Sequence, residues 1–449
     1  MGLVYPLPTQ QSSVHGKEIQ LEKCLGKTVL VIGSGGREHA IVDALSRSPQ
    51  VSKIYCAPGN AGIGLQAFNV PLKDTDVEGL KSFALENQVD LTVVGPESSL
   101  AAGLVDAFRE AGLAVFGHTK AATRIESSKE FAKELMLKYG IPTAGYRSFS
   151  SYDEALEYVA GRPFPAVLKY DGLAAGKGVV IAQDLEEARA ALASMLLDEA
   201  FGKGRVVVED FLTGPEFSFL CFVDGPNVYP MPLSQDHKRA FDGDKGPNTG
   251  GMGAYTETFA AGRSGLSFIS DADYGFAVTK ILQPVADAMA DAGTPLTGVL
   301  YGGLMKTPDG IKVIEFNARF GDPETEVVLP RLETDIYDVF EAVACGTPIP
   351  QLHWKDESVL GVVLASNGYP GSYAKGAPID IAPGYAERVY HMGTKRADDG
   401  RLQTAGGRVL MAVASAPSTP EAARRCYAAV GQIQCDNLFY RRDIAKFVL

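Results

Sequence analysis

Short apolar runs alternate with amphipathic stretches along the first part of the chain. The run Lys27–Ile32, rich in β-branched residues, leads through a glycine-rich turn, Gly33–His39, into an amphipathic stretch, Ala40–Ser48. Three further runs each end at a glycine or proline loop: Ile54–Cys56, Leu91–Val94 and Ala114–Phe116. Strands that alternate with helices predict an α/β fold with a parallel sheet. Ligands of such sheets bind beyond the carboxyl ends of the strands, where we expect these loops: 33–39, 57–62 and 95–97.

Helix-capping signals mark the middle of the chain. Ser127 with Glu130, and Ser151 with Glu154, have the spacing of a capping box. We therefore expect one helix to begin at Ser127 and end near Gly140, and a second helix to begin at Ser151.

Residues 149–216 have the pattern of a small α/β unit. A glycine-rich loop, Tyr170–Gly178, separates the first two of its three predicted strands, which are Pro165–Lys169, Val179–Ile181 and Arg205–Glu209. Residues 217–350 return to longer strands and helices, and their motifs fall in two blocks: 235–255 and 314–326. The last part of the chain alternates strand signals with turns such as Ala405–Arg408.

The net charge of the chain argues against two classes of partner, nucleic acids and anionic membranes. The chain has a net charge of −12 and a pI of about 5.1, whereas nucleic acids and anionic membranes attract a positive field. No apolar run approaches the roughly 20 residues of a membrane helix, and the polar first 26 residues lack a signal-peptide core. We expect no nucleic-acid or membrane partner, about three or four domains, and a disordered extension at 1–26.

The cysteines are scattered and form no CxxC pair: Cys24, Cys56, Cys221, Cys345, Cys426 and Cys435. The sequence has no histidine and cysteine cluster with zinc spacing. Scattered thiols in a chain of this length are typical of reduced core residues in the cytosol. The expected localisation is therefore cytoplasmic.

The loop Gly33–Glu38 resembles a dinucleotide-binding fingerprint but fails its stricter test. Glu38 stands where the third glycine belongs, and the second strand does not end in the acid that holds a ribose hydroxyl. These departures argue against NAD. The backbone of Gly35 and Gly36, together with Arg37, could still hold a phosphate at a helix N-terminus. A tight turn that binds nothing is the alternative.

A second glycine-rich loop, Gly172–Gly178, lies between two predicted strands. It is shorter than a Walker A loop, and Gly178 replaces the Ser/Thr that would bind magnesium. With Lys169 on the strand before it and Lys177 within it, the loop is typical of a flap that folds over a polyphosphate and excludes water. The alternative is a flexible hairpin turn with solvated lysines, which this density of glycine and lysine disfavours.

The predicted strand Lys312–Asn317 ends in an acid and an amide. Because side chains alternate along a strand, Glu315 and Asn317 share one face, about 7 Å apart, while Phe316 points to the core. Hard oxygen ligands on one face suit a magnesium ion that also bridges nucleotide phosphates. A solvated edge strand is the alternative, but the following Ala318–Glu324, with an arginine and two acids around a turn, favours the metal site.

The other motif block concentrates cations in a chain that is acidic overall. In Ser234–Arg239, Asp236 could receive an ammonium group, and the three basic residues after it could neutralise a transferring phosphate. The run Gly246–Gly253 allows close backbone approach to a very small substrate. Cations are needed because unit charges of like sign 4 Å apart repel by about 4 kcal/mol at a dielectric of 20. A charged surface loop is the alternative.

Together the motifs resemble the ATP-grasp superfamily and, within it, the phosphoribosylamine–glycine ligase family. The resemblance runs from about Lys27 to the end of the chain, including Tyr440–Ile444. The residues that carry it are Gly33–Ala40, Ala57–Gly62, Val94–Glu97, Asp171–Val179, Ser234–Arg239, Gly246–Tyr255 and Glu315–Glu324. The departures are the N-terminal extension, Tyr170 in place of a small residue, and Pro215 before Glu216.

The resemblance implies an ATP-grasp fold with a parallel-sheet, Rossmann-like domain in front and a small domain behind. After the extension at 1–26, the implied parts are a phosphoribosylamine-binding domain at 27–127, a central ATP-grasp domain at 128–148 and 217–350, a nucleotide-binding lid at 149–216 and a C-terminal domain at 351–449.

The resemblance also implies a step of purine biosynthesis. ATP, glycine and 5-phosphoribosylamine would give ADP, phosphate and glycinamide ribonucleotide through glycyl phosphate. The implied ligands of Mg²⁺ or Mn²⁺ are Glu315 and Asn317. The implied ATP-binding residues are Lys129, Lys169, Gly176, Lys177, Gly178, Glu209, Phe211, Leu212 and Glu216. The implied substrate-binding residues are Gly35, Gly36, Arg37, Asn60, Gly95, Pro96, Glu97, Asn248, Gly250 and Gly251. The implied catalytic residues are Asp236, His237, Lys238 and Arg319.

Two rival functions stay open at this point. One is another ATP-grasp ligase that uses a different acid, and the other is a nucleotide-binding regulatory protein without turnover. The second would usually lack Glu315, Asn317 or Arg319, all of which are present. Because phosphoribosylamine is labile, we also expect a transient contact with the amidotransferase that produces it. The sequence leaves open a monomer or a homodimer, and it does not select the metal.

Overall fold

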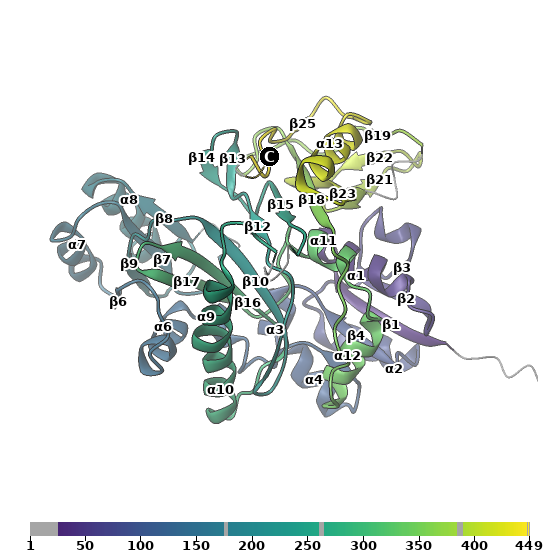
Figure 1. The fold of residues 1–449 in the computed structure, drawn as a ribbon, viewed down its shortest axis with the longest axis horizontal. Helices are drawn as coiled ribbons and strands as arrows, with labels where there is room; N and C mark the ends of the chain where they lie inside the picture. The colour runs from purple at the N-terminus through teal and green to yellow at the C-terminus, as the bar shows by residue number, and fades with distance from the viewer. Residues whose placement is uncertain (1–25, 175–177, 260–264, 384–388, 447, 449) are drawn as a thin grey trace, which may run out of the picture.

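The computed structural model describes residues 26–174, 178–259, 265–383, 389–446 and 448 of the chain (Figure 1). The expected disordered extension lies outside the described residues except for Gly26. The described strands form a five-stranded, a six-stranded and two four-stranded sheets, together with three two-stranded ribbons.

The N-terminal part is a five-stranded parallel sheet with the strand order β3-β2-β1-β4-β5. Its strands are β1 (Lys27–Gly33), β2 (Val51–Pro58), β3 (Phe68–Asn69), β4 (Leu91–Val94) and β5 (Val115–Phe116). Its helices are α1 (Gly36–Ser46), η1 (Ile63–Leu65), α2 (Val77–Glu86), α3 (Glu97–Ala101) and α4 (Leu104–Glu110). The inner strands β1 and β4 are continuous apolar runs because both of their faces are covered. The predicted parallel sheet is confirmed, with the loops after β1, β2 and β4 at one edge.

Helix α1 begins at Gly36, earlier than the predicted start at Ala40. The Glu38 carboxylate accepts a hydrogen bond from the Gly35 N–H (2.6 Å) and so caps the first turn. The predicted glycine-rich turn is thus shorter than expected, because only Ser34 and Gly35 connect β1 to α1 and residues 36–39 already belong to the helix. The polar residues 37–39 are buried.

Two helices lead from the first sheet toward the lid: α5 (Arg124–Ser127) and α6 (Lys129–Lys138). The cap of α6 is Ser128, whose Oγ accepts a hydrogen bond from the Phe131 N–H (3.2 Å). The predicted cap at Ser127 is therefore wrong, because Ser127 is the last residue of α5. The second predicted cap is confirmed, since Ser151 Oγ accepts from the Glu154 N–H (3.4 Å).

A small antiparallel sheet with the order β6-β9-β7-β8 lies at residues 146–210 and is called the lid, after its expected role. Its strands are β6 (Tyr146–Phe149), β7 (Ala166–Tyr170), β8 (Val179–Ala182) and β9 (Val206–Asp210). Two helices pack on it in a hydrophobic cluster of their own: α7 (Tyr152–Ala160) and α8 (Leu185–Leu196). The three strands predicted for this unit are confirmed.

The central sheet is antiparallel, with the order β11-β10-β16-β17. Its strands are β10 (Glu216–Asp224), β11 (Asn227–Pro230), β16 (Thr297–Thr307) and β17 (Gly310–Asn317). The helices of this part are α9 (Asp271–Ala277), η2 (Val278–Leu282), α10 (Gln283–Asp291), α11 (Thr325–Val328), η3 (Leu329–Arg331) and α12 (Ile336–Cys345). The predicted strand that ends in an acid and an amide is confirmed as part of β17.

The six-stranded sheet joins the first motif block to the C-terminal part of the chain. Strands β12 (Gln235–Asp236) and β15 (Gly253–Thr256) pair in series onto β18 (Ser358–Ser366). The sheet continues through β23 (Arg408–Ala416) to β20 (Val389–His391), with β25 (Leu438–Phe439) beside β18. Helix α13 (Thr419–Val430) packs on β18 and β23. The three ribbons are β13 (Arg239–Phe241) with β14 (Lys245–Asn248), β19 (Asp380–Ile381) with β24 (Ile433–Gln434), and β21 (Thr394–Arg396) with β22 (Leu402–Thr404).

One hydrophobic cluster runs through three parts of the molecule. It contains Val31 from the first sheet, Phe222 and Phe340 from the central part, and Met411 from the C-terminal part. These parts therefore share a core and hold their facing loops in fixed positions. None of the helices in the described ranges combines the length and apolar character that crossing a bilayer requires.

Candidate active site

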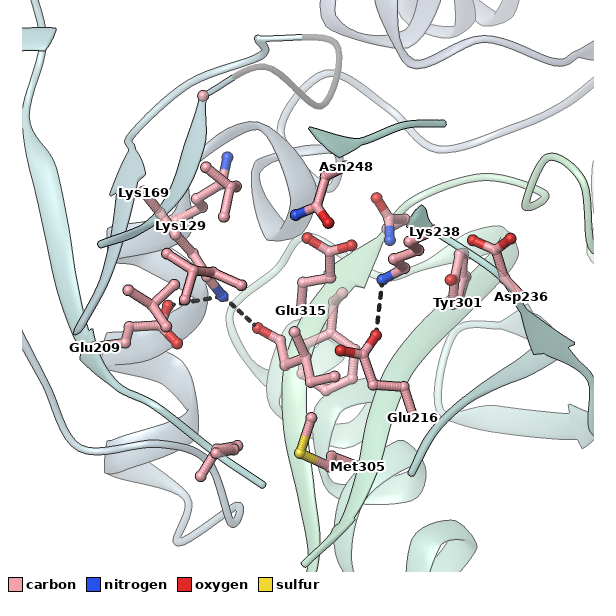
Figure 2. Close-up of a pocket in the computed structure, with 18 of the residues that line it drawn as sticks. Lys129, Lys169, Glu209, Glu216, Asp236, Lys238, Asn248, Tyr301, Met305 and Glu315 are labelled. Carbon is pink, nitrogen blue, oxygen red and sulfur yellow. Dashed lines mark hydrogen bonds and ion pairs between the residues drawn. The ribbon is translucent and has the colours of Figure 1, made fainter. Parts of the chain in front are cut away.

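A cavity of about 1240 Å³ lies where the lid, the central sheet and the first motif block face one another. Its walls come from β7 and β9 of the lid, from β17, and from residues 235–250. Figure 2 shows the Glu315 carboxylate between Lys129 and Lys169 on one side and Lys238 on the other. A pocket for a single ligand usually has roughly 300–1000 Å³, so this cavity has room for a nucleotide and a second substrate.

Strand β17 presents Glu315 and Asn317 to the cavity. Phe316 between them is 3% exposed and belongs to the core, so the predicted alternation is confirmed. The pairing of β17 with β16 shifts next to Glu315. At this irregularity the Ile314 carbonyl accepts a hydrogen bond from Lys169 Nζ (2.9 Å), which ties the central sheet to the lid.

The surroundings of Glu315 favour an ionised carboxylate. Burial alone would raise the pKa of Glu315, but Lys238, Lys169 and Lys129 outweigh it and hold the pKa below its ordinary value. This carboxylate accepts no hydrogen bond from the residues that the structure describes. It is therefore a charged oxygen donor available to a ligand.

A divalent cation fits these donors. The described residues contain no group of three or more His, Cys, Asp or Glu side chains that could hold a metal ion. Magnesium, however, is usually held by one or two protein oxygens together with substrate phosphates. The Glu315 carboxylate and the Asn317 amide oxygen match that arrangement, because both line a cavity large enough for a nucleotide.

Two lid-side lysines are fixed by contacts that leave their charge at the cavity. Lys169 pairs with Glu209 (3.0 Å), and Lys129 Nζ donates to the Gly172 carbonyl (3.0 Å) at the start of the flap. Burial and the charge of Lys169 lower the pKa of Lys129, although Glu315 opposes this shift. Such lysines suit the phosphates of a nucleotide.

The other predicted ATP-binding residues fall into two groups. Those that line the cavity are Gly178, Glu209, Phe211, Leu212 and Glu216. Gly176 and Lys177 lie outside the described residues. Phe211 is 40% exposed and so offers an apolar surface to a base at the cavity wall.

Asp236 and Lys238 reach the cavity from β12 and the residues after it (Figure 2). Lys238 pairs with Glu216 (3.3 Å), and although burial lowers its pKa, Glu216 and the other acids nearby raise it well above its ordinary value. Burial and the neighbouring Glu324 raise the pKa of Asp236. Asp236 Oδ1 is buried and, among the described residues, has no hydrogen-bond partner. An ammonium group would complete this site.

His237 differs from its two neighbours. Some of its atoms line the cavity, but its Nε2 accepts a hydrogen bond from the Ala445 N–H (3.2 Å) at the C-terminal end of the chain. Burial and Arg441 lower the pKa of His237 to about 4, so the ring is neutral. His237 Nδ1 is buried and has no hydrogen-bond partner in the part of the chain that the structure describes, so the expected direct role of His237 stays a prediction.

Arg37 and Arg319 meet at a network of buried acids between the first sheet and β17. Arg319 pairs with Glu97 (3.3 Å) and with Glu126 (3.3 Å), and Arg37 pairs with Glu38 (2.6 Å). These acids raise the pKa of Arg319 although burial lowers it. All five side chains are thus held without a ligand, and Arg37, Glu97, Glu126 and Arg319 line the cavity.

Comparison with known proteins agrees with this geometry. Three family models match consecutive parts of the chain: the phosphoribosylglycinamide synthetase N domain at 27–126, the ATP-grasp (A) domain at 127–325 and the C domain at 359–447. The chain belongs to the phosphoribosylglycinamide synthetase family. A phosphoribosylamine–glycine ligase of Halalkalibacterium halodurans is 50% identical over 93% of this chain and 96% of its own length. A protein of the same name from Salmonella typhimurium is 46% identical over 93% and 97%.

Solved structures place the fold of this phosphoribosylglycinamide synthetase family member among ATP-grasp proteins. The phosphoribosylamine–glycine ligase of Thermotoga maritima is 31% identical, with a TM-score of 0.81 over 93% of this chain and all of the other. The biotin carboxylase domain of a Hydrogenobacter thermophilus 2-oxoglutarate carboxylase has a TM-score of 0.70 at 17% identity, over 92% of this chain and 91% of that domain, a likeness of fold alone. The predicted ATP-grasp fold is confirmed.

Asn60, one of the predicted substrate-binding residues, holds its own loop in place and does not line the cavity that the described residues form. Asn60 is 8% exposed; its Nδ2 donates to the Ser34 and His391 carbonyls (2.8 Å each), and its Oδ1 accepts from the Gly62 N–H (2.9 Å). These bonds use its amide group. The expected contact of Asn60 with substrate is therefore not supported.

One donor of the predicted anion site at the start of α1 is used by the chain itself. The Gly35 N–H donates to the Glu38 carboxylate (2.6 Å), so the phosphate contact expected of Gly35 stays a prediction. A Cβ on Gly95 would lie 2.1 Å from Glu38 Oε1, and one on Gly36 would lie 2.3 Å from Glu326 Oε1. These glycines make room for buried acids. Within the described residues, the cavity lining contains none of the predicted positions Gly35, Gly36, Gly95, Pro96 and Gly251.

Two predicted substrate-binding residues at the end of β14 and in the loop after it do face the cavity. Asn248 and Gly250 line the cavity. Gly251 has φ +112°, and a Cβ there would lie 2.6 Å from Asp236 Oδ1 and 2.4 Å from Pro323 Cδ. Only glycine fits this position without a shift, so the loop is packed closely against Asp236.

Several cavity residues escaped the sequence analysis because their partners are distant in the chain. Lys133 pairs with Glu209 (2.8 Å), and burial lowers the pKa of Lys133 to about 8. Arg408, from a predicted turn, pairs with Asp322 (2.9 Å) and donates to the Gly250 carbonyl (2.7 Å). Glu126, Tyr301 and Glu324 also line the cavity. Glu324 lies in a sequence motif and Arg408 in a predicted turn, whereas Lys133, Glu126 and Tyr301 belong to no motif.

Proposed function

We propose that this chain uses ATP to join glycine to 5-phosphoribosylamine, giving glycinamide ribonucleotide, ADP and phosphate. The observation that carries the proposal is Glu315, an ionised acid at the centre of one cavity. Lys129 and Lys169 face it from one side, and Lys238 and Asp236 from the other. A nucleotide phosphate and an amino acid carboxylate would therefore meet beside Glu315. Membership of the phosphoribosylglycinamide synthetase family supports the choice of substrates.

The first chemical step forms glycyl phosphate. An oxygen of the glycine carboxylate attacks the γ-phosphorus of ATP, and the bond from that phosphorus to the β,γ-bridging oxygen breaks, releasing ADP. Glu315 and Asn317 would hold the magnesium ion, which supplies positive charge to the phosphate oxygens when bound. Lys129 and Lys169 hold the phosphates, and Asp236 receives the glycine ammonium. The protein contributes positioning and charge, with no covalent intermediate on a side chain.

The second step forms the amide. The amine nitrogen of phosphoribosylamine attacks the carbonyl carbon of glycyl phosphate, the carbon–oxygen bond to phosphate breaks, and the amine loses a proton. Negative charge develops on the carbonyl oxygen and on the departing phosphate. Arg319 and Lys238 stabilise this charge, because both cations are fixed by carboxylates at the cavity wall.

The parts of the chain divide this work. Residues 27–127 would bind phosphoribosylamine through Arg37 and Glu97, and the lid at 149–216 would close over the nucleotide. Residues 128–148 and 217–350 would hold the metal and glycine, and residues 351–449 would buttress the first motif block. The separate hydrophobic cluster of the lid supports its movement as a unit.

We also place the chain in the cytoplasm. The buried thiols of Cys56, Cys221 and Cys426 each donate to a backbone carbonyl, as reduced core cysteines do. The lability of phosphoribosylamine supports a transient contact with the amidotransferase that produces it.

The direct test is ADP release with ATP, glycine and freshly generated phosphoribosylamine, each omitted in turn. Sustained ADP release is expected only with all three present. In parallel reactions alanine, bicarbonate and formate replace glycine, and each is expected to support a much lower rate. Equal rates with these acids would favour another ATP-grasp ligase. ATP binding without turnover in the complete mixture would favour a regulatory protein.

A further inference from the structure

The ribbon β13–β14, residues 239–248, is an exposed part of the cavity wall. Every residue of β14 is exposed. The turn has two positive φ angles, Gly243 at 74° and Asp244 at 55°, and Gly246 in β14 has a third at 81°. An isolated two-stranded hairpin is marginally stable in water. The position of this ribbon therefore has to come from contacts outside it.

The C-terminal residues 441–445, here called the C-terminal hook, supply those contacts (Figure 1 shows the end of the chain beside β13 and β14). Arg441 is fully buried. Its Nη1 donates to the Arg239 carbonyl (3.1 Å) and its Nη2 to Asp244 Oδ1 (2.8 Å). Asp443 holds the same guanidinium through Nε (2.7 Å) and Nη2 (2.9 Å). Arg441 thus connects the start of β13 and the turn of the ribbon to the hook.

Two further hydrogen bonds fix the turn of the ribbon. The Gly243 N–H donates to Asp443 Oδ2 (2.8 Å), and the Arg442 N–H donates to Asp242 Oδ1 (2.8 Å). Since each strand of the ribbon is short and forms few hydrogen bonds of its own, the hydrogen bonds to the hook contribute much of the order of the ribbon.

The hook also fixes the segment just before the ribbon. The Ala445 N–H donates to His237 Nε2. His237 stands between Asp236 and Lys238, whose side chains line the cavity. A shift of Ala445 would therefore be passed through the imidazole to both neighbours.

We propose that Arg441 and the C-terminal hook are a positioning element for the acceptor side of the active site. This inference rests on the proposed function for the identity of the acceptors, glycine and phosphoribosylamine. The hook acts through the ribbon on Arg239 and Asn248 and through His237 on Asp236 and Lys238.

The nucleotide side is held by different contacts. Lys169 is fixed by Glu209 and by the Ile314 carbonyl, and Lys129 by the Gly172 carbonyl. Among the described residues, none of these contacts involves the ribbon or the hook. Loosening the hook should therefore affect the acceptors much more than ATP, a selectivity that a loss of global stability would not produce.

The test uses the full-length variants Arg441→Lys and Asp443→Asn. Lysine keeps the charge but cannot reach the Arg239 carbonyl, Asp244 and Asp443 together. Arg441→Lys is expected to raise KM for glycine or phosphoribosylamine by about tenfold and to lower kcat, while KM for ATP stays within about twofold. Asp443→Asn should give a smaller effect of the same selectivity. Arg425→Lys is the matched control, because Arg425 pairs with Glu421 (2.7 Å) on the exposed side of the same C-terminal part.

Hydrogen exchange of the same variants provides a readout that needs no turnover. Amides of 239–248 are expected to exchange faster in Arg441→Lys, and amides of the lid at 149–216 to keep their rates. Equal changes in all three KM values, or unchanged exchange in the ribbon, would overturn the inference. A wild-type chain that does not use glycine would instead refute the proposed function, and the exchange result would still decide whether the hook orders the ribbon.

Discussion

Glu315→Gln is expected to lower kcat by about a thousandfold or more while the fold is retained. The amide keeps the shape of the side chain and one oxygen donor, but it removes the negative charge that Lys238, Lys169 and Lys129 stabilise. A divalent cation beside three lysines depends on that charge. Charge stabilisation by a bound metal is worth several kcal/mol, and about 4 kcal/mol corresponds to a factor of a thousand in rate.

Two measurements check this expectation. One is kcat from ADP release with all three substrates, and the other is the affinity for ADP by calorimetry with and without Mg²⁺. The wild type should bind ADP more tightly when Mg²⁺ is present, and Glu315→Gln should lose that difference. Asp309→Asn is the matched control, an acid-to-amide change on the exposed β16–β17 turn. Near-normal rates in Glu315→Gln would refute the metal assignment.

Arg319→Lys is expected to lower kcat by about a hundredfold, the scale of removing one donor from a developing oxyanion. Arg319 Nε pairs with Glu97 (3.3 Å), and its Nη2 pairs with Glu126 (3.3 Å) and also donates to Asn317 Oδ1 (3.3 Å). Lysine offers one ammonium and cannot hold these acids at once. KM for ATP should change little, because Lys169 is held by Glu209 and Lys129 by the Gly172 carbonyl, and not by Arg319.

Steady-state kinetics with each substrate varied in turn would check this second expectation. Arg424→Lys is the control, since Arg424 pairs in two hydrogen bonds with Glu421 (2.9 and 2.8 Å) but lies exposed on α13. Loss of ATP affinity with an unchanged kcat would contradict the role of Arg319 in charge stabilisation. It would assign Arg319 to nucleotide binding instead.

Local patterns predicted the parts of the structure that depend on neighbours in the chain. The strand at 91–94 was predicted at its full length, because its apolar run is buried on both faces. The common face of Glu315 and Asn317 followed from alternation alone, and Phe316 lies in the core as expected. The alternation of side chains along a strand can be predicted without knowing the rest of the fold.

Long-range contacts account for what sequence reasoning missed. His237 looked like a phosphate ligand beside Lys238, but its partner, Ala445, comes from the other end of the chain. The amide of Asn60 is used by its own loop and by His391. Arg408 read as a turn residue, and only the tertiary structure brings it to Asp322. No local pattern encodes which distant residue will hydrogen-bond to a given donor or acceptor.

The path of a single oxygen atom tests the central claim, that glycine is activated as an acyl phosphate in the cavity around Glu315. Glycine labelled with ¹⁸O in its carboxylate would be used with ATP and phosphoribosylamine, and the phosphate released would be analysed by mass spectrometry. One labelled oxygen should appear in each phosphate, because the carboxylate oxygen that attacks phosphorus leaves with it. Phosphate without the label would contradict the account.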